Sequence, residues 1–318
     1  METKKKVNLS EITLYLGVIV IFLAITVACK VVGKDFFTLS NIFNIIAQAS
    51  ITSIIAIGAS LVILTGGIEL SVGSVVGFAG ILGGILIKNG IPVAAACAAI
   101  LLSGIVFGAF NGILVSYGKV PAFITTLGTM QIARGMALLI NAGQPVSGFP
   151  QGLSMIMGTR VFGKIPISVF YVAIFYLVVI FMMSYTKFGR HVYSLGGNVN
   201  AARLSGVRVK RVEMMVYILC GAFAAIAGIM LLSRLTYADP NAGNGYEMNA
   251  IAATVIGGIS LSGGRGRIGN SLVGAIILST LTCGLQIMNV ATYYQTIITG
   301  LVIIAAVFAD KRKERRAE

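Results

Sequence analysis

The chain has 318 residues and a net charge of +14, and 57% of its residues are hydrophobic while only 11% are charged. Because a soluble domain carries about 25% charged residues, this composition excludes an ordinary soluble protein. The basic residues lie between long apolar runs, and this distribution argues against a nucleic-acid partner in spite of the high charge.

The apolar runs are near the roughly 20 residues that a helix needs to cross hydrocarbon, and they lack the alternation of membrane-barrel strands. We therefore predict an all-α integral membrane protein in which residues 1–318 form a single transmembrane domain. About ten spans are expected, at 12–32, 44–64, 70–87, 92–116, 121–140, 166–184, 214–233, 249–261, 269–288 and 293–309. The eighth of these is short for a full crossing.

The first span follows Lys4, Lys5 and Lys6, so a signal peptide is the alternative interpretation, but its length and the spans after it favour a retained helix. With the N-terminus inside, 17 lysines and arginines lie on the inner side and 6 on the outer side, and Arg134 lies within a span. Basic residues favour the cytoplasm, so the tail at 1–11 and the basic tail at 310–318 are both predicted to be cytoplasmic.

Two glycine-rich segments interrupt the apolar pattern, and they predict broken or re-entrant helices near 65–73 and 257–266. Residues 66–73 read GGIELSVG, and residues 257–264 read GGISLSGG. Transporters often contain weak internal symmetry of this kind, although glycine is frequent enough in membrane helices for chance to be a fair rival explanation.

Two connecting segments are long. The segment at 141–165 is predicted to lie outside, and the strongly basic segment at 185–213 is predicted to be a cytoplasmic loop. Within it, Ala201 to Leu204 can form a short helix that Gly206 ends and that Asn198 or Asn200 caps. A short exposed helix suits docking to a cytoplasmic partner; the alternative is a basic loop that holds to anionic lipid.

Charged side chains within the spans are sparse, while neutral polar ones are more plentiful, and we take six residues as candidates for a translocation pathway or gate. They are Glu69, Asn44, Gln48, Thr125, Thr129 and Arg134. A charge buried in hydrocarbon costs roughly 3 kcal/mol or more unless it is paired or hydrated. The structural alternative for the two charged residues is an ion pair or a position at a helix end. For the neutral polar residues, to which Asn111 and Gln131 also belong, the alternative is hydrogen bonding between helices.

The sequence offers little enzyme chemistry. It has one histidine, His191, in the basic loop, and it has neither a metal-ligand cluster nor a Walker phosphate-binding motif. No cofactor is expected in this chain, which should not hydrolyse ATP by itself. The four cysteines are expected to pack as small apolar residues, and several glycines should allow close helix approach: Gly80, Gly83, Gly84, Gly104 and Gly108.

Short motifs along nearly the whole chain, from about residue 36 to 313, are similar to those of a known protein family. They include LTGGIELSVGS at 64–74, VPAFITTLGTM at 120–130, GGN at 196–198, ARLSG at 202–206, GYE at 245–247 and IAA at 251–253. Each is modest alone, but in this order they are specific. The chain resembles the permease subunits of ABC importers for ribose, galactose, xylose and related compounds.

This resemblance implies a homodimeric pore in the cell membrane, with a separate ATPase bound inside and a solute-binding protein outside. It implies import of a monosaccharide or a similar small hydroxylated solute by alternating access, and an ATPase-coupling segment at Asn200, Ala201, Ala202, Arg203, Leu204, Ser205 and Gly206. Many importers have glutamate where this chain has Asn200, and the family usually has aspartate where this chain has Glu69.

Two further interpretations stay open at the level of sequence. The outer basic residues Arg160, Lys164 and Arg234 are candidates for docking an acidic surface of the binding protein, while interfacial snorkelling explains them equally well. The alternative function is an ion-coupled secondary sugar transporter, although it would usually need more intramembrane acidic groups than this chain has.

Overall fold

The computed structural model describes residues 9–315. Most of the predicted N-terminal tail at 1–11 and the last residues of the predicted tail at 310–318 therefore lie outside the described residues.

Helices form most of this described part of the chain. They are α1 (Leu9–Val31), α2 (Leu39–Leu64), α3 (Val72–Lys88), α4 (Val93–Ser116), α5 (Ala122–Ile140), α6 (Gln151–Gly158), α7 (Ile167–Tyr185), α8 (Lys187–Gly197), α9 (Val199–Leu204), α10 (Val209–Leu235), α11 (Tyr246–Ile256), α12 (Ile268–Ile287) and α13 (Thr292–Arg315). Four two-residue strands accompany them: β1 (Val146–Ser147), β2 (Arg160–Val161), β3 (Ile165–Pro166) and β4 (Tyr237–Ala238).

The prediction of an all-α membrane protein is confirmed, but the count of about ten spans is not. Seven helices between residues 9 and 315 are long and apolar enough to cross a membrane: α1, α2, α4, α5, α7, α10 and α12. Helix α3 and the apolar part of α13 are shorter. The predicted eighth span corresponds to α11, whose 11 residues reach only about 16 Å, roughly half the hydrocarbon thickness.

Local chemistry explains where several helices begin and end. Thr38 caps α2 by accepting a hydrogen bond from the Asn41 backbone N–H at 3.2 Å. Prolines precede the first residues of α4, α5 and α7, where their fixed φ suits a helix start and no backbone N–H is lost from the ladder. Helix α2 ends at Leu64, and Gly66 follows with φ +81°, a conformation that favours glycine.

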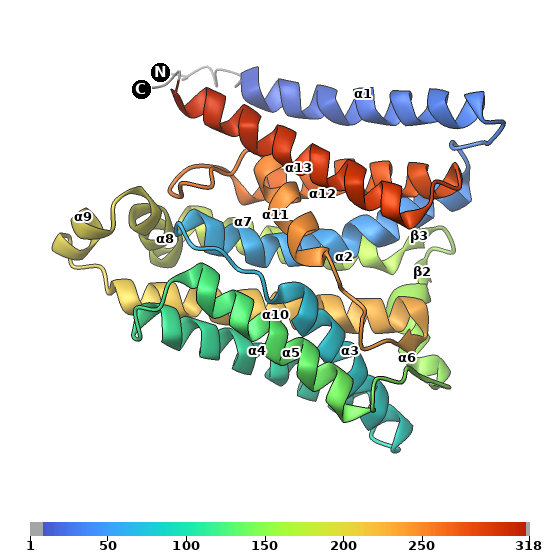
Figure 1. The fold of residues 1–318 in the computed structure, drawn as a ribbon, viewed down its shortest axis with the longest axis horizontal. Helices are drawn as coiled ribbons and strands as arrows, with labels where there is room; N and C mark the ends of the chain where they lie inside the picture. Colours follow the sequence, from blue (N-terminus) through green and yellow to red (C-terminus); the bar gives the residue numbers. More distant parts are fainter. Residues whose placement is uncertain (1–8, 316–318) are drawn as a thin grey trace.

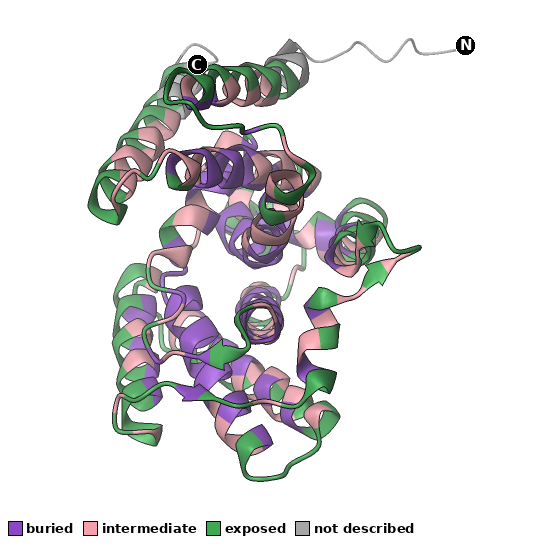
Figure 2. Ribbon diagram, turned by 90° about the vertical axis from the view of Figure 1, so that its right-hand side faces the viewer, coloured by how far each residue is buried: buried purple, intermediate pink, exposed green. Residues whose placement is uncertain are grey.

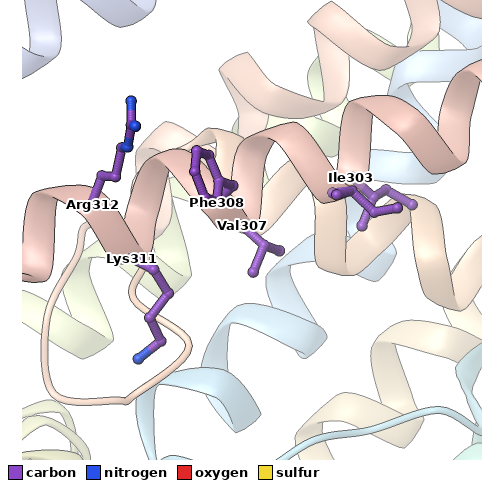
Figure 3. Close-up of a pocket in the computed structure, with 6 residues that line it drawn as sticks. Ile303, Val307, Phe308, Lys311 and Arg312 are labelled. Atoms are coloured by element: carbon purple, nitrogen blue, oxygen red, sulfur yellow. The ribbon is translucent and has the colours of Figure 1, made fainter.

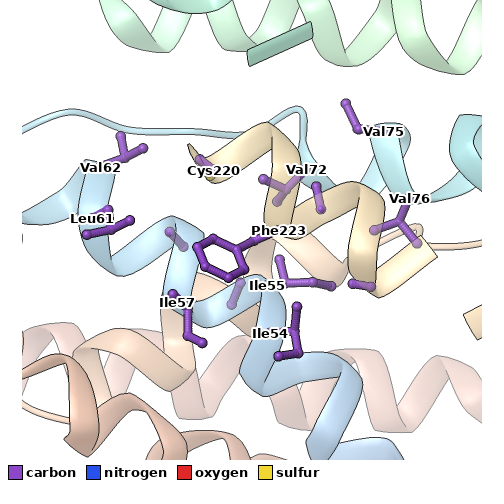
Figure 4. Packing of buried hydrophobic residues seen from close by; sticks show 14 of the residues in the cluster. Ile54, Ile55, Ile57, Leu61, Val62, Val72, Val75, Val76, Cys220 and Phe223 are labelled. Atoms are coloured by element: carbon purple, nitrogen blue, oxygen red, sulfur yellow. The ribbon is translucent and has the colours of Figure 1, made fainter. Parts of the chain in front are cut away.

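Helices α2 and α10 form the centre of the bundle. Buried residues make up 78% of an apolar 18-residue stretch of α2 but only 11% of the corresponding stretch of α1, which lies at the periphery. Figure 2 shows the same contrast, with central helices almost wholly buried and outer helices exposed on one face. In Figure 4, Ile54, Ile57 and Leu61 of α2 pack around Phe223 of α10 and beside Val72 of α3.

Close approach between α4 and α10 depends on glycine. A Cβ atom at Gly104 would lie 2.5 Å from the Ala225 Cβ, and one at Gly108 would lie 2.9 Å from the Ile218 Cα, so neither site has room for a side chain. The prediction for these two glycines is confirmed, as it is for Gly83, which touches Ile100 of α4. It is not confirmed for Gly84, which lies against Ala238 of β4 and against Phe149 of a connecting segment rather than against a helix. It is wrong for Gly80, which has no such neighbour within 4 Å.

Helices α3 and α11 both begin near the middle of the bundle (Figure 1). Non-helical backbone separates α2 from α3 at 65–71 and α11 from α12 at 257–267, so both predicted breaks are confirmed. A third break, at 239–245 before α11, was not predicted. It contacts the start of α3, since a Cβ atom on Gly243 would lie 3.2 Å from the Val76 Cβ. The predicted break at 257–266 lies against the first break, since the Gly264 N–H donates to the Leu64 carbonyl oxygen at 2.9 Å.

The two long connecting segments contain regular structure. Between residues 141 and 165 lie α6, β1 and β2, with β1 paired to β4 and β2 paired to β3, both antiparallel. The predicted loop at 185–213 is mainly the helices α8 and α9, because Thr186 and Asn198 cap them. Figure 1 shows α8, α9, the start of α1 and the end of α13 at one end of the bundle (the α9 end) and α6, β2 and β3 at the other (the α6 end).

Candidate functional site

Glu69 lies in a buried hydrogen-bond network at the first break. It is 4% exposed, and its carboxylate accepts hydrogen bonds from the Ser71 backbone N–H at 2.7 Å, the Ser71 hydroxyl at 2.6 Å and the Asn111 amide at 2.8 Å. Thr129 of α5 donates to the Asn111 carbonyl oxygen at 2.5 Å. The network joins the break to α4 and α5, and it satisfies a carboxylate that burial would otherwise penalise.

Three other candidates lie apart from this network. Thr125 shares a face of α5 with Thr129, but its buried hydroxyl has no hydrogen-bond partner among residues 9–315. Gln48 of α2 accepts a hydrogen bond from the Cys283 thiol of α12 at 3.4 Å. Asn44, one turn earlier on α2, is exposed. The structure thus brings Glu69 and Thr129 together and leaves Asn44 and Gln48 on the α12 side of the bundle.

Arg134 ties α5 to the third break. Its Nη1 donates to the Pro240 carbonyl oxygen and, at 3.0 Å, to the Ala242 carbonyl oxygen. It also lies against Gly77 of α3, and Glu247 and Asp239 attract it electrostatically. These contacts agree with the structural interpretation of a paired charge within a span.

A polar cavity of about 210 Å³ opens beside Arg134, between α3, α5 and α11. It is lined by Ser74, Met130, Gln131, Arg134, Asn241, Asn244 and Glu247. Of these, only Arg134 was among the candidates from the sequence. The sequence could have identified two more of them, because Glu247 stands in the GYE motif just before an apolar run and Gln131 lies inside a predicted span. Asn241 and Asn244 could be identified only from the fold.

The predicted coupling segment contains a short capped helix, as expected. Asn198, rather than Asn200, caps α9 by accepting a hydrogen bond from the Ala201 N–H at 2.9 Å. Gly206 follows the helix with φ +82°. Ala202 is 1% exposed and holds the helix to the protein, whereas Leu204 is 90% exposed. Helix α9 therefore projects an apolar side chain outward among basic residues.

Glycines join α8 to both predicted breaks. The Gly264 N–H donates to the Leu64 carbonyl oxygen at 2.9 Å, and a Cβ atom on Gly264 would lie 2.7 Å from the Gly197 nitrogen. A Cβ atom on Gly196 would overlap the Leu64 carbonyl. Tyr193 of α8 donates to the Gly266 carbonyl oxygen at 2.9 Å. Helix α8 therefore contacts the end of α2 and the break before α12 directly.

The outer basic candidates all lie at the α6 end. Arg160 and Lys164 are exposed on the β2–β3 hairpin, and the Arg160 guanidinium lies 4.7 Å from the centre of the Phe43 ring. Arg234 is near the end of α10 and is partly buried. Phe162, at the tip of the hairpin, is 89% exposed.

Other cavities differ in character from the one beside Arg134. An apolar groove of about 650 Å³ runs along α13 and ends at Lys311 and Arg312 (Figure 3). A cavity of about 380 Å³ lies beneath α9 and reaches Gly66 at the first break. The first suits the hydrocarbon boundary, and the second lies at the α9 end.

The helices, the breaks between them and the buried polar network define a multi-pass membrane protein with an interrupted core. Residues 41–307 match the family described as "Branched-chain amino acid transport system / permease component". The ribose import permease protein RbsC of Escherichia coli K12 is 41% identical over 300 residues, covering 93% of each chain. RbsC of Bacillus subtilis 168 is 38% identical, covering 98% of this chain and 97% of the relative.

The D-allose transport system permease protein AlsC of Escherichia coli K12 is 40% identical over 277 residues, covering 87% of this chain and 85% of the relative. No solved structure matches the chain. The protein belongs to this family of ABC-importer permeases, within its monosaccharide group, and it is a multi-pass protein of the inner membrane.

Proposed function

We propose that the chain is the permease subunit of an ATP-driven importer that moves a monosaccharide or a similar small hydroxylated solute into the cytoplasm. The observation that carries the proposal is the 41% identity to a ribose import permease over 93% of both chains. The relative named for D-allose supports the same solute class. The permease needs no cofactor of its own, and ATP is hydrolysed by a partner subunit.

In this proposal the α9 end is cytoplasmic, both termini included, and α9 docks into the ATPase. The exposed Leu204 and the residues from Asn200 to Gly206 make that contact, and movement of α9 reaches the two breaks through Gly196 and Gly264. Two copies of the permease form the pore, which alternates between inward and outward openings as the ATPase binds and hydrolyses ATP.

The α6 end then faces the solute-binding protein, and Arg160, Lys164 and Arg234 attract its acidic surface. Charge reversal of Arg160 and Lys164 is expected to weaken binding-protein affinity at low salt more than at high salt, because such contacts are screened by ions. Unchanged affinity at low salt would remove this part of the proposal.

Purification of a tagged copy from its native cells in mild detergent, followed by mass spectrometry, tests the assembly. We expect an ATPase that carries a Walker lysine to accompany the permease. A homo-oligomer that lacks an ATPase and still moves sugar under an ion gradient would favour the ion-coupled secondary transporter instead.

A further inference from the structure

The cavity beside Arg134 has the features of a binding site rather than of a packing defect. Six of its seven lining residues carry a polar or charged side chain, with Met130 the exception. Glu247 and Ser74 are buried, whereas Gln131, Asn241 and Asn244 are exposed at its open side. The cavity therefore has a charged floor, a polar mouth and an entrance.

The cavity lies beside the middle of a candidate membrane span. Helix α5 is a candidate span from Ala122 to Ile140, and Gln131 is the tenth of its 19 residues. Helices α3 and α11 also begin near mid-bundle (Figure 1). Half-helices whose N-terminal ends meet at this depth are the usual frame of a solute site in transporters, because their free N–H groups and the surrounding polar side chains replace water.

Hydrogen-bonding capacity at the mouth is unused. The side-chain amides of Gln131, Asn241 and Asn244 form no hydrogen bond to any residue that the structure describes. Toward residues 9–315, Arg134 donates hydrogen bonds only through Nη1, to the Pro240 and Ala242 carbonyl oxygens. Each amide offers two donors and an acceptor, and a guanidinium has five N–H donors. Unmet polar groups at mid-membrane depth are unfavourable against lipid, so this face requires water, solute or protein.

The chemistry of the lining indicates the ligand class. A sugar hydroxyl both donates and accepts, so it can bond to the Glu247 carboxylate, to amides and to the Arg134 guanidinium at once. A volume of about 210 Å³ holds about seven water molecules at roughly 30 Å³ each. That is below the range of about 300–1,000 Å³ typical of ligand pockets. A single sugar ring is therefore the largest neutral solute that the cavity suits.

We infer that this cavity is a solute-binding site within the permease, in which Gln131, Arg134, Asn244 and Glu247 hydrogen-bond a neutral monosaccharide on its passage through the pore. The inference rests on the proposed function, which requires a solute to pass but does not require the permease to bind it. Glu69 has a different role here, because its bonds to Ser71 and Asn111 hold the frame on which α3 begins.

The test uses the complete importer, reconstituted with its ATPase and binding protein. The double variant Gln131→Leu/Asn244→Leu removes two amides at the mouth without touching the Arg134 anchor. Gln286→Leu on α12 is the matched control, since Gln286 is an exposed amide outside the cavity. The probes are radiolabelled D-ribose and D-allose, with ATP-driven uptake and binding-protein-stimulated ATPase activity measured on the same vesicles.

Each lost hydrogen bond to the solute lowers binding about three- to tenfold. We expect the double variant to lower uptake at least about tenfold while ATPase stimulation stays within about twofold of the unmodified protein. The control should match the unmodified protein in both. Unchanged uptake in the double variant contradicts only the proposed site, whereas uptake by the unmodified permease that depends on an ion gradient and not on ATP contradicts the proposed function. Equal losses of uptake and ATPase stimulation also contradict the site, because they assign these amides to assembly.

Discussion

The contact between α4 and α10 gives a quantitative prediction for Gly104→Ala. The new Cβ atom would lie 2.5 Å from the Ala225 Cβ and closer still to the Gly221 carbonyl oxygen, where ordinary contacts begin at 3.4 Å. Helices α4 and α10 must therefore separate by about 1 Å at this point. Overpacking of this kind costs about 1–3 kcal/mol, and it offsets the roughly 1 kcal/mol that alanine gains over glycine in a helix.

Gly80→Ala on α3 is the matched control for this prediction. Gly80 is also buried in a helix, but an added Cβ atom meets no atom within 4 Å. The control is expected to stabilise the protein by up to about 1 kcal/mol, and because both variants have this gain, their free energies of unfolding should differ by the overpacking cost of about 1–3 kcal/mol. Titration of the detergent-solubilised protein with SDS measures both values. Equal stabilities would refute the claim that glycine sets the distance between α4 and α10.

Three further changes probe the rest of the account. Asn111→Leu removes the amide between Glu69 and Thr129, and it should lower the free energy of unfolding by about 2 kcal/mol or more, measured by the same titration; unchanged stability would contradict the network. Leu204→Asp alters a side chain that is 90% exposed, so stability should stay within about 0.5 kcal/mol while co-purification of the ATPase falls; retained ATPase would contradict docking through α9. Gly196→Ala forces α8 away from the first break, so ATPase activity should become independent of solute-loaded binding protein. ATPase activity that solute-loaded binding protein still stimulates would contradict coupling through the contact between α8 and the first break.

Sequence reasoning located most of the helices because their apolar runs are long and proline or glycine marks the ends. The prediction of a span at 44–64, for example, agrees with α2 apart from its first turn. The short helices α6 and α8 were not predicted, since neither has a long apolar run. Thr186 caps α8 from the adjacent position, but contacts that hold the two helices in place, such as those with Ser233 and Gly266, come from distant residues. The eighth span was predicted at 249–261, whereas α11 runs from Tyr246 to Ile256. The predicted span extends too far because the sequence after Ile256 stays as apolar as the helix.

The candidate site was only partly predictable. Burial of a charge in an apolar sequence identified Glu69 and Arg134, but their partners are 42 and 106 residues away. Spacing along one helix cannot indicate that Asn111 bridges Glu69 and Thr129, or that α3 and α11 meet end to end. The third break was not predicted, because residues 239–245 follow a predicted span and resemble an ordinary loop in sequence. Only the fold shows that they lie against α3.

Solute uptake into sealed vesicles tests the central claim most directly. The permease is reconstituted with the ATPase that accompanies it and with the binding protein outside, and radiolabelled D-ribose and D-allose are offered with ATP inside. The account predicts uptake of one of these sugars or of a close relative, dependent on ATP and on the binding protein and unaffected by dissipation of ion gradients. Uptake by the permease alone under a proton or sodium gradient would contradict it.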